Sequence, residues 1–356
     1  MSQLKGKNID YFCLRYDEPY LHIPDELLET WIATLVNRNV CRLHIDVISD
    51  MPMCLFTCKT IVDLTLNESC CPVLFAGSVC LPVLKKLRMY YVVMSDESFK
   101  HLIAGCPMLE EFIIWRSFSY FLSGRFLSPP SLTRLELRTE TIESVMETVL
   151  TVKLDTPAVR YHDLTDIRSE NFSAVVLDSL IEADISISMF DPDDSIDSHS
   201  MIGFLRKLHK VECLTLSAPL MEEVPDSAFH AMAIKFPNLT KLKLFTDFRF
   251  ISFFLENAEN LEIIQINLSD CGHGCWIEPR NVPACLLSHL RTVSIHGFEC
   301  LERDFNMVRY ILKNAKVLRR VDIYTQSYCN LEKRHEALQR ISLFERQSAA
   351  CQLAFQ

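Results

Sequence analysis

An apolar triplet with the spacing L-x-x-L-x-L recurs along the chain, and its copies lie 21 to 31 residues apart. The fourth and sixth positions of each six-residue copy fall on the same face of a strand, because strand side chains alternate in direction. Each copy therefore predicts one short strand with a single buried face. The twelve copies are centred on Leu43, Leu64, Leu87, Phe112, Leu135, His162, Ala183, Leu214, Leu242, Ile264, Val293 and Val321.

Proline supports this interpretation. Five copies carry a proline two residues before their first apolar position, where a missing N–H does not interrupt a strand ladder. These prolines are Pro82, Pro107, Pro130, Pro157 and Pro237. A unit of about 25 residues cannot bury an apolar face alone, so neighbouring units must stack on one another. The spacing is typical of leucine-rich repeats (LRRs), and it predicts an α/β solenoid in which a curved parallel sheet carries helices on its convex side.

Helical segments are expected to lead into several strands. Three such segments are residues 95–105, 226–235 and 304–314. In the first, Ser95 is expected to cap the helix start, and Gly105 to supply a left-handed residue at its end.

The third and fifth positions of each copy point away from the core and are mostly polar, so we identify them as candidate partner-binding residues. Their charges change sign along the predicted concave face, which suits a protein partner with complementary patches. For any single residue, a merely solvated side chain remains an equal alternative. The candidate residues are Arg42, His44, Lys86, Arg88, Arg134, Glu136, Tyr161, Asp163, Glu182, Asp184, Lys241 and Lys243.

Composition disfavours several classes of function. The chain has only 8 glycines in 356 residues, and the glycine-rich motifs of nucleotide-binding proteins and serine hydrolases are absent, so we expect no enzyme. A formal net charge of -10 argues against nucleic-acid binding. The sequence lacks a signal peptide and any long apolar run, so we expect no membrane association and a cytoplasmic or nuclear protein.

Neither a cofactor nor a metal is expected. The sharpest metal candidate is the cluster Cys271-Gly272-His273-Gly274-Cys275, but its spacing lacks the paired knuckles of structural zinc sites. The acidic run at residues 191–197 lacks the glycine and the glutamate of a calcium-binding loop.

The last eighty residues carry a second set of motifs. They read W-x-x-P at 276–279, V-P-x-C-L at 282–286, G-F at 297–298, Y-I-L-x-N-A at 310–315 and R-x-S-x-x-C-x-L-x-F at 346–355. This pattern resembles the FBD module that ends the plant F-box/FBD/LRR-repeat proteins. In that family an F-box docks onto the Skp adaptor of a cullin-based (SCF) ubiquitin ligase, while the repeats select the substrate. The resemblance implies a protein-binding solenoid of the substrate-recruiting kind.

The sequence departs from that family near its start. An F-box occupies about forty residues in the family, yet Val40 already opens the first repeat, and residues 23–28 only mimic an F-box start. We therefore expect an F-box to be missing, which leaves docking to the Skp adaptor open. The expected domains are an N-terminal linker or capping segment at 1–39, repeats at 40–275 and an FBD-like module at 276–356 that continues the solenoid. The alternative function is a scaffold or competitor that binds partner proteins without a ligase.

Overall fold

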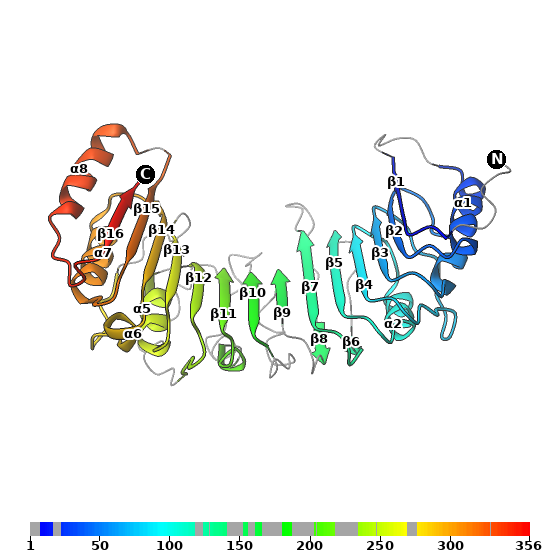
Figure 1. Ribbon diagram of the computed structural model, residues 1–356, viewed down its shortest axis with the longest axis horizontal. Helices are drawn as coiled ribbons and strands as arrows, with labels where there is room; N and C mark the ends of the chain where they lie inside the picture. The colour runs from blue at the N-terminus through cyan, green and yellow to red at the C-terminus, as the bar shows by residue number, and fades with distance from the viewer. Residues whose placement is uncertain are drawn as a thin grey trace, which may run out of the picture. The chain divides into compact units, whose positions relative to one another are not determined.

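The computed structural model divides the chain into two compact units, residues 1–179 and 180–356 (Figure 1). We call them unit 1 and unit 2. The described residues are 8–16, 23–117, 124–127, 129–140, 152–155, 161–165, 180–186, 203, 205–217, 234–246, 248–268, 276–327 and 329–356.

Unit 1 is built on a parallel sheet in which neighbouring strands follow one another along the chain, except for a small separate pair, β6 (Gly124–Leu127) and β8 (Val152–Asp155). The main sheet runs in the order β1 (Tyr11–Arg15), β2 (Arg42–Asp46), β3 (Asp63–Asn67), β4 (Lys86–Tyr90), β5 (Glu111–Ser117), β7 (Arg134–Glu140) and β9 (Tyr161–Thr165).

Unit 2 repeats this arrangement with seven parallel strands in sequence order. They are β10 (Glu182–Ser186), β11 (Cys213–Ser217), β12 (Lys241–Phe245), β13 (Ile263–Asn267), β14 (Thr292–Phe298), β15 (Arg320–Thr325) and β16 (Gln352–Phe355). The predicted solenoid of short parallel strands is therefore confirmed in both units.

The repeat copies pair position by position. Leu43 lies opposite Leu64, which lies opposite Leu87, and the same register continues through Phe112 to Leu135. Each of these five side chains is buried. In unit 2 the ladder passes through the central residues of the copies from Ala183 to Val321 and ends at Leu353 of β16. A continuous apolar ladder is the result of stacking units that each bury a face on their neighbours.

The described helices lie on one side of the main sheet of each unit, and none of them covers its other side (Figure 1). The helices with described bounds are α1 (Asp25–Asn37), the 3₁₀ helix η1 (Met53–Thr57) and α2 (Asp96–Ala104) in unit 1, and α5 (Phe248–Asn257), α6 (Ala284–Ser288), α7 (Glu302–Asn314) and α8 (Leu331–Ser342) in unit 2. Helix α5 contacts α6, α6 contacts α7, and α7 contacts α8, so these helices stack along with the strands.

The expectation for α2 is half right. The Ser95 hydroxyl accepts a hydrogen bond from the Ser98 amide at 3.2 Å, as an N-cap does. Gly105, however, has a φ of -80°, so the prediction of a left-handed residue is wrong. A Cβ at this position would lie 2.8 Å from the Val79 carbonyl oxygen. Glycine is needed here for close backbone approach.

Three other expectations about local structure have different outcomes. The helix at 304–314 is confirmed as α7. The helix at 226–235, apart from residues 234–235, and Val159, the first apolar position of the copy centred on His162, lie outside the described residues. The structure also adds β1, which pairs with β2 and lies in the expected linker or capping segment, where no strand was predicted.

Truncation of the ladder should destabilise the protein strongly. We expect Leu135→Ala and Leu242→Ala each to lower the free energy of unfolding by about 2–5 kcal/mol, because each leaves a cavity between neighbouring repeats. Ile263→Ala is the matched control, since this strand residue is 38% exposed, and it should cost about 1 kcal/mol or less. Urea denaturation measures all three, and equal losses for the ladder and control variants would contradict the register.

Candidate functional site: the open strand faces

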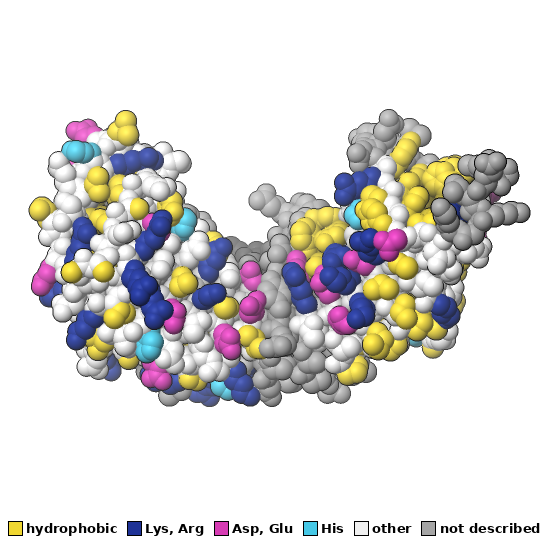
Figure 2. All heavy atoms as spheres, in the orientation of Figure 1, with side chains coloured by type: hydrophobic (Ala, Val, Ile, Leu, Met, Phe, Trp, Pro, Cys, Tyr) yellow, Lys and Arg dark blue, Asp and Glu magenta, His cyan; other side chains and the backbone are white. Residues whose placement is uncertain are grey.

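Each sheet has one face that no described helix covers, and we call it the open face of its unit. It is formed by the third and fifth residues of each repeat copy, together with the residue two positions further along the strand. The strand register aligns these positions into three columns that run across the strands. Figure 2 shows interleaved basic and acidic side chains over β3–β7 of unit 1, and a more separated arrangement in unit 2.

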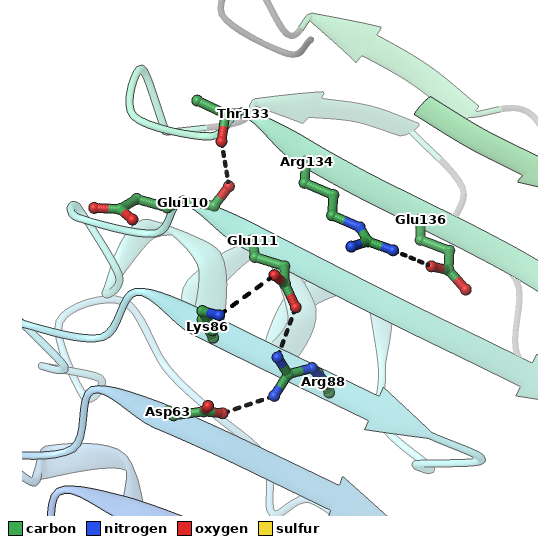
Figure 3. Close-up of polar contacts among 8 residues, drawn as sticks. All are labelled: Asp63, Lys86, Arg88, Glu110, Glu111, Thr133, Arg134 and Glu136. Atoms are coloured by element: carbon green, nitrogen blue, oxygen red, sulfur yellow. Dashed lines mark hydrogen bonds and ion pairs between the residues drawn. The ribbon is translucent and has the colours of Figure 1, made fainter. Parts of the chain in front are cut away.

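Arg88 is the centre of an ion-pair network on the open face of unit 1 (Figure 3). Its Nη1 donates to Asp63 Oδ1 at 2.8 Å, and its Nη2 donates to Glu111 Oε1 at 2.7 Å. Lys86 Nζ approaches the other oxygen of Glu111 at 3.8 Å. Four charges on three adjacent strands therefore neutralise one another, and Arg88 is not a free positive charge.

Burial disfavours the charged form of Arg88, but the Asp63 and Glu111 carboxylates outweigh that effect and raise the pKa of Arg88. The guanidinium side chain is only 24% exposed. Because two strands hold its carboxylate partners in register, Arg88 works as a cross-strand clamp as well as a surface group.

A second polar group on this face surrounds an aromatic pair. The indole Nε1 of Trp115 donates to Glu136 Oε1 at 2.9 Å, and Arg134 reaches the other oxygen of Glu136 at 3.4 Å. Tyr90 packs edge-on against Trp115 with ring centroids 4.9 Å apart. Two half-buried aromatic rings bordered by paired charges form the kind of surface on which protein interfaces concentrate binding energy.

The first strands of unit 1 contribute less charge than the sequence indicates. Arg42 forms an ion pair with Asp10 and lies over the Tyr11 ring, 5.6 Å from its centroid. His44 is half-buried; burial lowers its pKa, and the positive charge of Arg15 lowers it further. His44 is therefore mainly neutral at pH 7.

The open face of unit 2 has a different electrostatic character. Lys241 and Lys243 occupy its first two columns on β12, and neither has an ion pair within the described part of the chain. Lys243 Nζ lies over the Phe245 ring, 4.9 Å from the centroid. Glu182 and Asp184 hold the same two columns on β10. Figure 2 shows acidic side chains over β10 and basic ones over β12.

Beyond β12, ring stacking and polar pairs order the open face of unit 2. His296 and Tyr324 stack with centroids 4.4 Å apart and an interplanar angle of 7°. Burial, followed by the nearby Lys243 ammonium, lowers the pKa of His296. The resulting neutral imidazole accepts a hydrogen bond at Nε2 from the Gln265 amide at 3.2 Å.

The structure describes candidate residues on the open face of each unit. Tyr161 and Asp163 lie on β9, but their side chains are outside the described part of the structure. On the open face of unit 1 lie Arg42, His44, Lys86, Arg88, Arg134 and Glu136, and on that of unit 2 lie Glu182, Asp184, Lys241 and Lys243.

Sequence reasoning missed the third column. Tyr90, Trp115, His296 and Tyr324 belong to it, and each lies two residues after a fifth-position residue. The alternation of buried and exposed side chains could have revealed this column, because it continues one residue beyond the L-x-x-L-x-L pattern.

We searched the described residues for possible metal sites and for helices that could span a membrane. Among them, no group of three or more His, Cys, Asp or Glu side chains could hold a metal ion. The cluster at Cys271–Cys275 lies outside them. Within the same residues, no helix combines the length and the apolar character that crossing a membrane requires.

The Arg88 network allows a direct test. Arg88→Met should lower the free energy of unfolding by about 1–3 kcal/mol, because it leaves Asp63 and Glu111 without their shared cation. Lys86→Met should change it by less than about 0.5 kcal/mol, since its ion pair is longer and more exposed. Thermal and urea unfolding compare the two, and equal effects would contradict the clamp.

Two family models match the chain, one for leucine-rich repeats and one for the FBD module. The family model "FBD-associated F-box protein At5g56370, LRR repeats" matches residues 28–159, and the FBD model matches residues 278–323. Neither match is to an F-box.

Individual proteins are also similar to this chain along nearly its whole length. The Arabidopsis thaliana F-box/FBD/LRR-repeat protein At1g78750 is 28% identical over 99% of this chain and 79% of its own length. F-box/FBD/LRR-repeat protein At3g26920 of the same plant is 28% identical over 92% of the chain and 75% of its own length. In its repeat ladder, its FBD segment and its similarity to these relatives, the chain resembles the plant F-box/FBD/LRR-repeat proteins along nearly its whole length.

Proposed function

We propose that the chain is a protein-binding receptor that holds its partner on the open strand faces. The observation that carries this proposal is the in-register columns of polar and aromatic side chains on a sheet face that no described helix covers. A parallel ladder of strands offers the area that protein recognition needs, and its side chains are fixed by cross-strand contacts before a partner arrives.

The chemistry of the faces fits recognition better than catalysis. Arg88, Glu111 and Glu136 are engaged in structural ion pairs and hydrogen bonds. Proteins of the F-box/LRR family are generally non-catalytic adaptors, and the chain's protein-binding role follows from the repeats it shares with them.

The finer proposal is a role as the substrate-recruiting part of an SCF-type ubiquitin ligase, acting in the cytoplasm or nucleus. It is supported by the names of the full-length relatives, which are F-box/FBD/LRR-repeat proteins. Ubiquitin transfer would then belong to other subunits, and this chain would position the substrate.

The second candidate is a scaffold or competitor that binds the same kind of partner without a ligase. The observation that favours it is the nature of the matched segments, which are repeats and FBD only. Both candidates use the open faces, so one purification experiment can separate them.

We expect substitutions on the open faces to remove specific partners. The full chain, tagged and incubated with plant extract, is compared by quantitative mass spectrometry with two variants, Trp115→Ala and the double variant Lys241→Glu/Lys243→Glu. The expected result is a set of proteins retained by the wild type and depleted at least severalfold by a face variant, because central aromatic residues and complementary charges carry interface energy.

Lys316→Glu/Lys333→Glu is the matched control, because both lysines are exposed outside the strands of unit 2 and the charge change is the same. Equal depletion by this control would contradict the proposal. Co-purification of the Skp adaptor with the wild type supports the ligase role. Its absence, with face-dependent partners retained, supports the scaffold.

A further inference from the structure

We propose that the β10–β12 part of the unit 2 open face binds an extended peptide segment that carries an acidic residue and, about three residues away, a basic residue. This inference rests on the proposed function and specifies the chemical class of the partner. It follows from where the charges of this face lie and from which of them are already neutralised.

Lys241 and Lys243 are the anchor for the acidic residue. Two positions apart on one strand, their Cα atoms lie about 7 Å from each other. Lys241 is exposed, and Lys243 extends over the ring of Phe245. Neither forms an ion pair with a described residue. A carboxylate placed between the two side chains would gain charge-assisted contacts with both.

Glu182 is the anchor for the basic residue. It lies in the same column as Lys241, two strands away, with the small Cys213 between them. Burial raises the pKa of Cys213, and the negative charge of Glu182 raises it further, while the positive charge of Lys241 lowers it. Both charges therefore act across the same short stretch of sheet.

The strand spacing sets the spacing of the peptide motif. Two strand separations of about 4.8 Å place Glu182 and Lys241 roughly 10 Å apart, and an extended peptide advances about 3.4 Å per residue. A peptide that crosses the strands thus brings residues three positions apart over the two anchors. On the far side of Lys241 lies Ile263, which is 38% exposed and offers an apolar contact beyond the acidic residue.

The alternating signs favour a peptide over a nucleic acid. A phosphate backbone carries a uniform negative charge, and Glu182 and Asp184 would repel it on the strand next but one to the lysines. The net charge of -10 opposes a polyanion further. The open face of unit 1 is a weaker candidate for acidic segments, because Arg88 and Arg42 there are already paired with carboxylates of the chain.

A peptide-display selection against the full chain tests the inference. A random 12-residue library is enriched on the wild type, and selected peptides are measured by fluorescence anisotropy. We expect enriched peptides to combine Asp or Glu with Lys or Arg about three positions away. Lys241→Glu/Lys243→Glu should weaken their binding about tenfold, because attraction becomes like-charge repulsion. Peptides whose acidic residue is changed to lysine should then prefer this variant to the wild type.

Several results would overturn the inference. In the selection, these are enrichment of peptides without acidic residues, or no enrichment at all. In the binding measurements, they are an equal loss of peptide affinity with Lys316→Glu/Lys333→Glu, or displacement of the peptides by a single-stranded oligonucleotide that binds more tightly. If peptides or extract proteins are lost with Trp115→Ala but not with the Lys241/Lys243 variant, the inference fails and the proposed function stands. If retention of every partner is independent of both faces, the proposed function fails as well.

Discussion

The stacking of apolar side chains from one repeat onto the next is the interaction on which the rest of the structure depends. A single repeat has one short strand and cannot bury its own leucines, so each becomes stable only between neighbours. The parallel register places Leu64, Leu87 and Phe112 in one buried row. Because strand side chains alternate, fixing this row also fixes every residue on the opposite face. The open faces are thus a direct consequence of core packing.

The same register gives the two open faces their different properties. On unit 1 it brings opposite charges into neighbouring positions, and Arg88 becomes the shared partner of two carboxylates. On unit 2 it keeps Glu182 and Lys241 two strands apart, with a neutral strand between them. One face has therefore satisfied most of its charges internally and presents Trp115 and Tyr90, while the other keeps charges available to a partner.

Much of this architecture could be predicted from the sequence, because the spacing of the apolar residues indicates where each strand lies and which residues pair across strands. The Ser95 cap could also be predicted, because its hydrogen bond joins residues that are close in sequence. What the sequence did not reveal depends on neighbours in space. Gly105 is required by the approach of Val79, and β1 is a strand only because β2 lies beside it. Whether a lysine or arginine on the open face is free or paired also depends on the adjacent strand, so the sequence alone did not reveal that Arg88 lies between Asp63 and Glu111.

Hydroxyl-radical footprinting of the full chain tests the central claim most directly, because it reads the exposure of individual side chains in solution. The account predicts rapid oxidation of the open-face residues Tyr90, Trp115 and Tyr324, and strong protection of their ladder neighbours Met89 and Phe112. Binding of a partner should then reduce the oxidation of open-face residues only. Comparable oxidation of ladder and open-face residues in the free protein would contradict the alternation, and with it the assignment of the open faces.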